Sequence, residues 1–201
     1  MYQRVKNYFR RTDPKLFKVL EEVGKLEEIK PISSREYFSH LCREIIGQQL
    51  SGKVVRIFLE RFKNLFPKKH ITPKFLSKLP DKKLRSIGVS WAKARYLKDL
   101  ACKVENKEIA LASLQRLGDE KVVEELVKIK GIGNWTAEMF LMFSLGREDV
   151  FSHGDLGLRK AIEKIYNLKN PTKSSIEQLS RKWRPYRTWA CRILWSSRDN
   201  K

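Results

Sequence analysis

Apolar side chains recur at three- and four-residue intervals along most of the chain, which is the spacing of one helix face. The clearest run covers residues 34–46, and its apolar positions are Tyr37, Phe38, Leu41, Ile45 and Ile46. A second run follows Gly52 and places Val54, Val55, Phe58, Leu59 and Phe62 on one face. No segment alternates apolar and polar residues with the two-residue period of a strand. The pattern predicts an all-α fold of about ten helices joined by short connections.

Prolines and glycines divide this helical pattern into segments. An amphipathic helix is expected from Asp13, its N-cap, with Pro14 at the first helical position. We separate an N-terminal helical segment, residues 1–33, from a larger helical domain, residues 34–201. In that domain we expect residues 34–125 to form one lobe and residues 126–201 to carry the turn described next and the C-terminal helices.

Residues 126–159 contain the most distinctive pattern in the chain: an apolar helix, a glycine turn, a second helix that begins at Trp135, and a loop that ends at Asp155. Gly131 and Gly133, one residue apart, let the backbone turn sharply and leave N–H groups free to face an anion. The N-terminus of the following helix adds partial positive charge. The turn predicts a phosphate-binding surface, and the alternative is a tight helix–helix corner without a ligand. A weaker copy of this turn surrounds Gly88.

Asp155 precedes a run of helical spacing, so its simplest interpretation is an N-cap. Its position in a strongly basic chain suggests a second role, because a carboxylate can stabilise an oxocarbenium-like sugar cation or orient a water molecule when a glycosidic bond breaks. A Ser152–His153–Asp155 hydrolase is disfavoured, because adjacent residues without a nucleophile elbow do not form that triad.

The charge balance indicates the kind of partner. The chain has 43 Lys and Arg residues against 23 Asp and Glu residues, a formal net charge of +20. Such an excess favours a polyanion, with nucleic acid first and an anionic membrane second, and the alternative is a solvated basic surface. No apolar run is long enough for a transmembrane helix and the basic N-terminus lacks a signal-peptide core, so we expect an intracellular protein and no membrane partner.

Five large aromatic side chains lie in the C-terminal half of the chain and stand out there: Trp135, Trp183, Tyr186, Trp189 and Trp195. Aromatic walls are what an extruded nucleobase needs for stacking, and core packing is the alternative for each ring. The three cysteines, Cys42, Cys102 and Cys191, fit neither a disulfide framework nor a zinc site, and we expect buried reduced thiols.

These motifs resemble one known family. The stretch GIGNWTAEMF followed by VFSHGDLGLRKAI is similar to the helix–hairpin–helix (HhH-GPD) DNA glycosylase superfamily, and the pattern is closest to its 3-methyladenine DNA glycosylase II, or alkylated-base, branch. IIGQQLSGKVV, GVSWAKARYLKDLA and WRPYRTWACRILW resemble three further motifs of that branch, in the family's order over about residues 34–196. The resemblance implies a two-lobed helical fold with the active-site cleft between the lobes.

The resemblance also implies roles for particular residues. Asp155 matches the catalytic aspartate. Gln48, Gln49 and Leu50 match the wedge that fills the gap left by the flipped nucleotide. The implied base pocket consists of Trp135, Met139, Trp195 and Glu138. The residues expected to contact DNA phosphates are Lys130, Gly131, Gly133, Asn134, Gly88, Ser90 and Lys93. Backbone carbonyls of the hairpin hold a monovalent cation in some relatives, and no other metal is expected.

Two absences narrow the predicted chemistry. Relatives that also cut the DNA backbone carry a Schiff-base lysine where this chain has Trp135, so we expect no lyase activity. The four-cysteine iron–sulfur motif of other members is missing, so we expect no cofactor and no iron–sulfur cluster.

The predicted function is a monomeric, monofunctional DNA glycosylase of base excision repair. It would flip an alkylated base, of the 3-methyladenine or 7-methylguanine type, out of double-stranded DNA and hydrolyse its N-glycosidic bond to leave an abasic site. Two alternatives stay open. One is a glycosylase of the same fold for deaminated, oxidised or mismatched bases, which Glu138 beside Met139 keeps open. The other is a helix–hairpin–helix DNA-binding module without catalysis.

Overall fold

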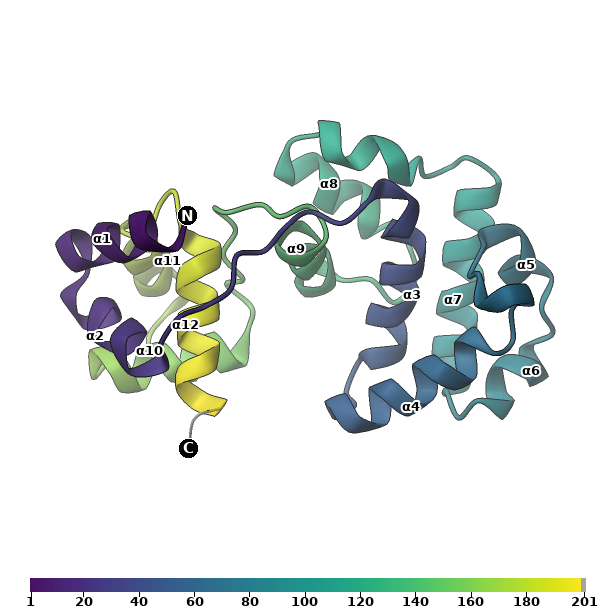
Figure 1. Cartoon of the computed structure of the whole chain (residues 1–201), viewed down its shortest axis with the longest axis horizontal. Helices are drawn as coiled ribbons and strands as arrows, with labels where there is room; N and C mark the ends of the chain where they lie inside the picture. Colours follow the sequence, from purple (N-terminus) through teal and green to yellow (C-terminus); the bar gives the residue numbers. More distant parts are fainter. Residues whose placement is uncertain (200–201) are drawn as a thin grey trace. The chain divides into compact units, whose positions relative to one another are not determined.

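The computed structural model describes residues 1–199, which form helices and connecting segments without a strand (Figure 1). The predicted all-α fold is confirmed. The chain divides into two compact units: the first contains Met1–Pro31 and Leu141–Lys201, and the second contains Ile32–Phe140.

The first unit joins the two ends of the chain. Its helices are α1 (Tyr2–Thr12), α2 (Pro14–Val23), α10 (Leu156–Tyr166), α11 (Lys173–Arg181) and α12 (Arg187–Asp199). Helix α2 packs against α12 and α10, while α1 packs against α2. This grouping differs from the division expected from the sequence, which separated residues 1–33 and placed a boundary after residue 125. Local periodicity shows that α2 has an apolar face, and only the folded chain shows which distant helix covers that face.

Asp13 connects the N-terminal helices to the C-terminal part of this unit. Its side chain caps α2 by accepting a hydrogen bond from the backbone N–H of Leu16, at 3.1 Å, which confirms the predicted N-cap. The same carboxylate accepts hydrogen bonds from the Tyr166 hydroxyl at 2.6 Å and from Trp183 Nε1 at 2.8 Å. Burial, and then the bond to Asp13, raise the pKa of Tyr166, so its hydroxyl remains a neutral donor. Asp13 is 5% exposed, and its buried charge is stabilised by these three donors.

The second unit contains the remaining helices. Its 3₁₀ turns are η1 (Ser34–Glu36), η2 (Pro67–Lys69) and η3 (Leu111–Arg116). Its α-helices are α3 (Tyr37–Gly47), α4 (Gly52–Lys63), α5 (Pro73–Lys78), α6 (Asp81–Ser86), α7 (Trp91–Glu105), α8 (Asp119–Leu126) and most of α9 (Asn134–Phe143). Helix α7 packs against α3, α5 and α6. The predicted interruption between the first two long helices is confirmed, because α3 ends at Gly47 and α4 begins at Gly52.

The cysteines differ from the expectation at one position. Cys42 and Cys191 are buried, as predicted, and Cys102 is exposed on α7, so the prediction of a buried thiol there was wrong. The spacing of apolar residues along a helix does not show which residues near its end are exposed to solvent. Burial raises the pKa of the Cys42 thiol, which keeps it protonated and unreactive.

We expect Asp13→Ala to lower the free energy of unfolding by about 2–4 kcal/mol, because it removes a helix cap and leaves the buried Trp183 indole and the half-buried Tyr166 hydroxyl without this acceptor. Urea denaturation followed by circular dichroism measures the change. Thr172→Ala is the matched control, because Thr172 caps α11 on the exposed surface through Ser175 N at 3.2 Å. It should cost about 1 kcal/mol. Equal costs for both variants would contradict the connecting role of Asp13.

Titration of the native protein with a thiol reagent should modify Cys102 first and leave Cys42 and Cys191 protected, because only the exposed thiol can be reached. Unfolding in denaturant should release the other two thiols. Peptide mass mapping after brief labelling identifies the modified residue, and labelling of Cys42 at the rate of Cys102 would contradict the burial.

Candidate nucleic-acid interface and active site

In the second unit, the loop between α3 and α4 is joined to the glycine hairpin. The Gln48 side-chain amide donates a hydrogen bond to the backbone carbonyl of Gly131, with 2.8 Å between Nε2 and the oxygen. On the other side of the loop, Lys93 Nζ donates to the carbonyls of Ile46 at 2.9 Å and Gln48 at 2.6 Å. These carbonyls lie at the C-terminus of α3, where a cation is favoured by the helix dipole. Three side-chain hydrogen bonds therefore hold the loop.

This arrangement distinguishes the three residues of the predicted wedge. Gln48 is half-buried and its amide is directed to the hairpin. Gln49 is exposed and has a φ of 59°, so the backbone there is in the left-handed region. Leu50 follows it and is half-buried. Gln49 and Leu50 stay predicted wedge residues, while Gln48 acts in this structure as a support for the loop.

The hairpin turns at Gly131 for two physical reasons. Its φ is 82°, which L side chains rarely adopt. A Cβ atom there would also lie 2.1 Å from Cδ2 of Tyr96, so the backbone of Gly131 packs directly against that ring. Asp99 Oδ2 accepts a hydrogen bond from the backbone N–H of Lys130 at 2.8 Å. Helix α7, which carries both Tyr96 and Asp99, therefore positions the hairpin.

Gly133 has a different role from Gly131. A Cβ atom at this residue would have no heavy atom within 4 Å, and the φ of Gly133 is not positive. Within the part of the chain that the structure describes, the backbone N–H groups of Gly133 and Asn134 donate no hydrogen bond. They lie at the N-terminus of α9, where the helix dipole favours an anion. Phosphate binding at these two residues stays a prediction, and their free donors suit it.

The second glycine turn is also fixed by packing. Gly88 has a φ of 104°, and a Cβ there would lie 2.8 Å from Cζ of Phe58. Ser90 caps α7 by accepting a hydrogen bond from the backbone N–H of Lys93 at 3.2 Å. Burial lowers the pKa of Lys93, whose ammonium is engaged with the α3 carbonyls. The expected phosphate contacts of Gly88, Ser90 and Lys93 stay predictions.

In the first unit, Asp155 caps α10, as predicted. Its Oδ1 accepts a hydrogen bond from the backbone N–H of Leu158 at 2.7 Å and another from Trp195 Nε1 at 3.3 Å. A Cβ on Gly157 would lie 2.9 Å from the same oxygen and 2.6 Å from Arg198 Nη1. The absence of a side chain at residue 157 therefore lets the carboxylate, the indole and a guanidinium approach the first turn of α10. Asp155 and Trp195, both predicted site residues, are brought together.

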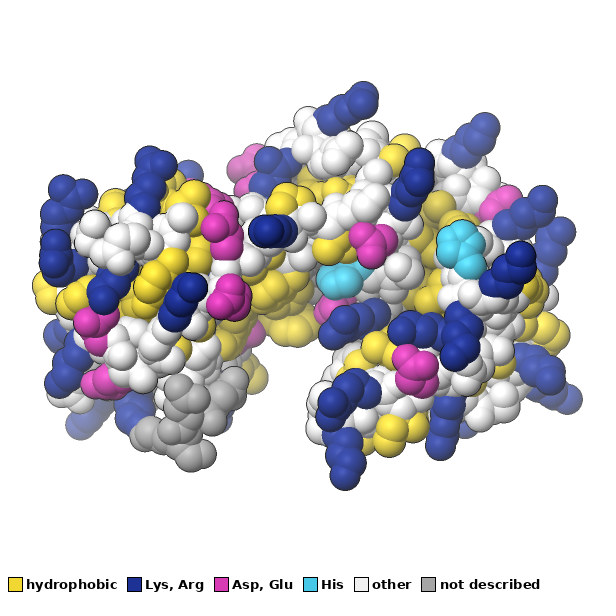
Figure 2. Space-filling view, in the orientation of Figure 1, with side chains coloured by type: hydrophobic (Ala, Val, Ile, Leu, Met, Phe, Trp, Pro, Cys, Tyr) yellow, Lys and Arg dark blue, Asp and Glu magenta, His cyan; other side chains and the backbone are white. Residues whose placement is uncertain are grey.

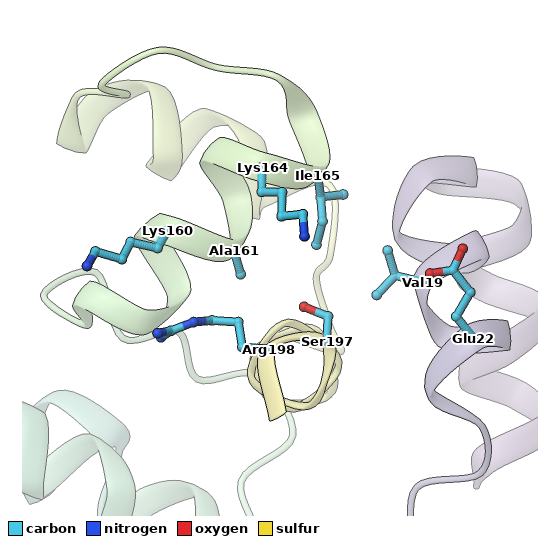
Figure 3. Close-up of a pocket in the computed structure, with 8 residues that line it drawn as sticks. All are labelled: Val19, Glu22, Lys160, Ala161, Lys164, Ile165, Ser197 and Arg198. Carbon is cyan, nitrogen blue, oxygen red and sulfur yellow. The ribbon is translucent and has the colours of Figure 1, made fainter. Parts of the chain in front are cut away.

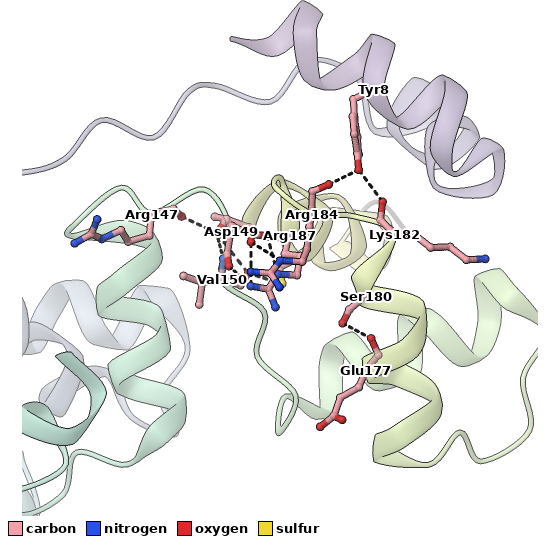
Figure 4. A network of polar contacts seen from close by, with 11 residues as sticks. Tyr8, Arg147, Asp149, Val150, Glu177, Ser180, Lys182, Arg184 and Arg187 are labelled. Atoms are coloured by element: carbon pink, nitrogen blue, oxygen red, sulfur yellow. Dashed lines mark hydrogen bonds and ion pairs between the residues drawn. The ribbon is translucent and has the colours of Figure 1, made fainter. Parts of the chain in front are cut away.

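The loop that leads to Asp155 is held by a polar network around Asp149 (Figure 4). Arg187 donates to Asp149 Oδ1 at 2.7 Å and to the Asp149 carbonyl at 2.6 Å, and Arg184 donates to Oδ2 at 3.0 Å. Thr188 Oγ1 donates to the carbonyl of Arg147 at 2.6 Å and accepts from the N–H of Val150 at 3.1 Å. Sequence reasoning missed this function of the WRPYRTW motif. Asp149 lies in a loop, and its two arginine partners come 35 and 38 residues later, so the sequence around it carries no local signal of this pairing.

His153 and Ser152 do not support a hydrolase triad. Ser152 is 1% exposed, so its hydroxyl is not accessible to a substrate. The His153 ring contacts the edge of Phe151 at a centroid distance of 4.8 Å, and its buried Nδ1 has no hydrogen-bond partner. Burial lowers the pKa of His153; the negative charge of Glu177 opposes this shift, and the smaller effects of Arg187 and Lys173 add to it.

The remaining predicted pocket residues belong to the second unit. Trp135 is 44% exposed, Glu138 is half-buried, and Met139 is 6% exposed. In the first unit the Trp195 ring lies 6.2 Å from that of Phe143, centroid to centroid. Because Trp135, Glu138 and Met139 belong to one unit and Asp155 to the other, their grouping into one pocket stays a prediction.

Each unit also contains a hollow. One of about 340 Å³ in the first unit is lined by residues of α2, α10 and α12, among them Lys160, Lys164, Arg198 and Glu22 (Figure 3). It has no aromatic wall on which a base could stack. Another of about 400 Å³ in the second unit contains Trp135 together with Gln48, Gln49 and Leu50. The second hollow therefore combines an aromatic ring with the predicted wedge.

Positive side chains cover much of the surface. Lys and Arg project over many parts of the visible face and outnumber the Asp and Glu among them (Figure 2), consistent with the net charge of +20. None of the helices formed by residues 1–199 combines the length and the apolar character that crossing a bilayer requires.

Within residues 1–199, no three His, Cys, Asp or Glu side chains gather as metal ligands. At the hairpin, the Gly131 carbonyl already accepts from Gln48 and the Ile129 carbonyl from Ile132 N, so a cation there stays a prediction.

The family follows from comparison with known proteins. Residues 42–185 match the model of the HhH-GPD superfamily base excision DNA repair protein family. The chain belongs to this superfamily. Its relatives place it in the 3-methyladenine glycosylase branch, which confirms the resemblance. DNA-3-methyladenine glycosylase 1 of Schizosaccharomyces pombe is 32% identical over 187 residues, which cover 90% of this chain and 80% of that protein. With one Bacillus subtilis relative the chain shares 32% identity but spans only 58% of its length.

Solved structures show the same fold. A DNA-3-methyladenine glycosidase from Bacillus halodurans matches with a TM-score of 0.81 at 35% identity, over 96% of this chain and 88% of that one. The Schizosaccharomyces pombe 3-methyladenine DNA glycosylase, solved in complex with abasic DNA, also has a TM-score of 0.81, at 29% identity over 96% of this chain and 95% of that chain. The HhH-GPD fold is thus shared along nearly the whole chain.

The two hairpin glycines should respond differently to alanine. Gly131→Ala should lower the free energy of unfolding by at least about 2 kcal/mol, because the new Cβ would clash with Tyr96 and the positive φ is strained. Gly133→Ala should change it by less than about 0.5 kcal/mol, because nothing lies near the added methyl group. Urea denaturation of both variants tests this. Similar losses in the two would show that the hairpin is not positioned by Tyr96.

Proposed function

We propose that this chain is a monofunctional DNA glycosylase that hydrolyses the N-glycosidic bond of alkylated bases in double-stranded DNA and leaves an abasic site. The observation that carries the proposal is the position of Asp155, a carboxylate held by Leu158 N–H and Trp195 Nε1 in a chain of this family. The names of the relatives, DNA-3-methyladenine glycosylases, support the alkylated-base substrate.

Asp155 would act on the sugar. An alkyl group at N3 or N7 of a purine makes the base cationic, so the C1′–N bond breaks with its electron pair moving to the base, which leaves neutral. The sugar becomes oxocarbenium-like, and a nearby carboxylate lowers the energy of that charge. Water then adds to C1′ and loses a proton. No general acid is required for such a leaving group.

The hydrogen bonds that the Asp155 carboxylate accepts suit it to stabilise the positive charge on the sugar. Donors from the α10 backbone and from Trp195 hold Oδ1 through two hydrogen bonds. The orientation of the group is thereby fixed before the substrate arrives, which reduces the reorganisation required during the reaction. The Asp149 network would serve the same purpose by holding the loop that precedes Asp155.

The hairpin and the loop at Gln49 would bind and distort the DNA. Free N–H groups of Gly133 and Asn134 suit a phosphate, and the net charge of +20 supports salt-dependent attraction to the backbone. Gln49 and Leu50, supported by Gln48, would enter the base stack while the lesion turns outward. The cost of extrusion, a few kcal/mol, is smaller for a weakly paired lesion.

Trp135 supports cleavage of the base without cleavage of the strand. Bifunctional members of the superfamily use a lysine at this position to form a Schiff base, and an indole cannot form one. An exposed indole can instead stack on a base, and it attracts a cationic base by about 0.5–2 kcal/mol.

Asp155→Asn should reduce release of 7-methylguanine or 3-methyladenine from duplex DNA by about 10³-fold, because the amide cannot offset the positive charge on the sugar. Asparagine caps helices as well as aspartate does, so stability should be unchanged. Single-turnover assays score abasic sites after alkali, and Asp81→Asn at the start of α6 is the control. Full activity in the Asn variant would remove Asp155 from the proposed role.

Strand breaks in the same assay test the monofunctional part of the proposal. Without alkali the wild-type reaction should leave the strand intact, and borohydride should trap no covalent protein–DNA complex. Strand cleavage by wild type without alkali would contradict it, and failure to release any alkylated base would contradict the glycosylase proposal itself.

A further inference from the structure

The hollow beside Trp135 contains a carboxyl group without a partner. This cavity, about 400 Å³, lies in the second unit and is lined by the C-terminal turn of α3, the loop at Gln49, the first half of α4, and Trp135 at the start of α9. Glu44 of α3 is its single acidic lining residue, and Arg43 and Arg56 are its basic ones. Its apolar lining comes from Leu50, Val55 and Leu59. A volume in this range suits a small organic ligand such as a purine base.

Glu44 is half-buried, yet within residues 1–199 its side chain forms no hydrogen bond and no ion pair. Burial raises the pKa of Glu44, while the positive charge of Arg43 opposes the shift. Placing a carboxyl group in a partly desolvated position without a partner is unfavourable for stability. Proteins often tolerate this cost in stability where the ionisable side chain contacts a ligand. A salt bridge with Arg43 would relieve it, and none forms between these two side chains within residues 1–199.

We propose that Glu44 is a specificity-determining residue whose carboxylate contacts the extruded base while that base stacks against Trp135, so that positively charged alkylated bases are preferred over neutral ones. The inference rests on the proposed function. It adds that Glu44 is the group that distinguishes a positively charged base from a neutral one.

The chemistry of the hollow matches this role. Trp135, which is 44% exposed, can stack on any base, but stacking alone does not strongly distinguish a cationic base from a neutral one. A carboxylate in the same hollow attracts the cationic ring, and this attraction is stronger where water is partly excluded. Arg43 and Arg56 are positively charged and would repel a cationic base, so neither can replace Glu44 in this role. The two arginines suit the DNA phosphates beside the lesion.

Glu44→Gln tests the inference, because it removes the charge and keeps the shape of the side chain. Single-turnover release of 7-methylguanine, which is cationic, should fall by roughly tenfold, while release of hypoxanthine, which is neutral, should change less than about twofold. Glu60→Gln is the matched control: Glu60 lies on α4, is exposed and pairs with Lys63 at 3.1 Å. It should leave both rates unchanged. Glu44→Asp, which retains the charge, should keep the preference for 7-methylguanine even where the overall rate falls.

Three results would overturn the inference. Equal losses for the two lesions in Glu44→Gln would indicate a general structural role, and unchanged rates would show that the carboxylate does not meet the base. An effect that depends on the base opposite the lesion, and not on the lesion, would place the unpaired partner base in the hollow. Thermal melting of each variant separates misfolding from these outcomes. If wild type released neither lesion, the proposed function would fail, which is distinct from a failure of the role of Glu44.

Discussion

The hydrogen bond from the Gln48 amide to the Gly131 carbonyl joins the two loops on which the proposed DNA interface of the second unit depends. Loops carry backbone groups that no helix satisfies, and a loop that must distort a DNA duplex has to be rigid. Here α7 supplies the rigidity: Lys93 bonds to the α3 carbonyls, Tyr96 lies under the hairpin, and Asp99 binds the Lys130 N–H. Residues of one helix thereby position both loops.

Asp155 is the N-cap of α10, and its proposed catalytic role is compatible with that position, although the two are alternatives when only the sequence is considered. As an N-cap it satisfies the backbone N–H of Leu158, and the same bond orients the carboxylate that would face the sugar. Trp195 adds a second donor from α12. A helix cap is thus a simple way to hold a catalytic carboxylate in one orientation. The structural and the chemical interpretations require the same geometry.

The C-terminal motif explains how the first unit holds the loop that precedes Asp155. Arg184 and Arg187 bind Asp149, and Thr188 binds the backbone at Arg147 and Val150. Farther from the site, Tyr8 donates hydrogen bonds to the carbonyls of Lys182 and Arg184 (Figure 4). Bonds of this kind add modestly to stability, each about 1 kcal/mol. Together with the buried Asp13 they make the N-terminal helices part of the unit that carries Asp155.

By itself the sequence determined the helical fold, the boundaries of the two long helices around Gln48 and Gln49, the caps at Asp13 and Asp155, and the family. Each of these depends on residues close together in the chain: helical periodicity, a capping residue before an apolar run, or glycines one residue apart. The net charge, which needs no structure, indicated a polyanionic partner.

Only the tertiary structure decided which segments meet. It placed residues 1–31 with the C-terminal helices, exposed Cys102, turned Gln48 toward the hairpin, and distinguished Gly131, which must lack a side chain, from Gly133, which faces open space. It also revealed that the Glu44 carboxyl group lines the same hollow as Trp135 and has no partner within residues 1–199. Contacts between residues far apart in the chain leave no local periodicity, because each depends on how distant helices pack.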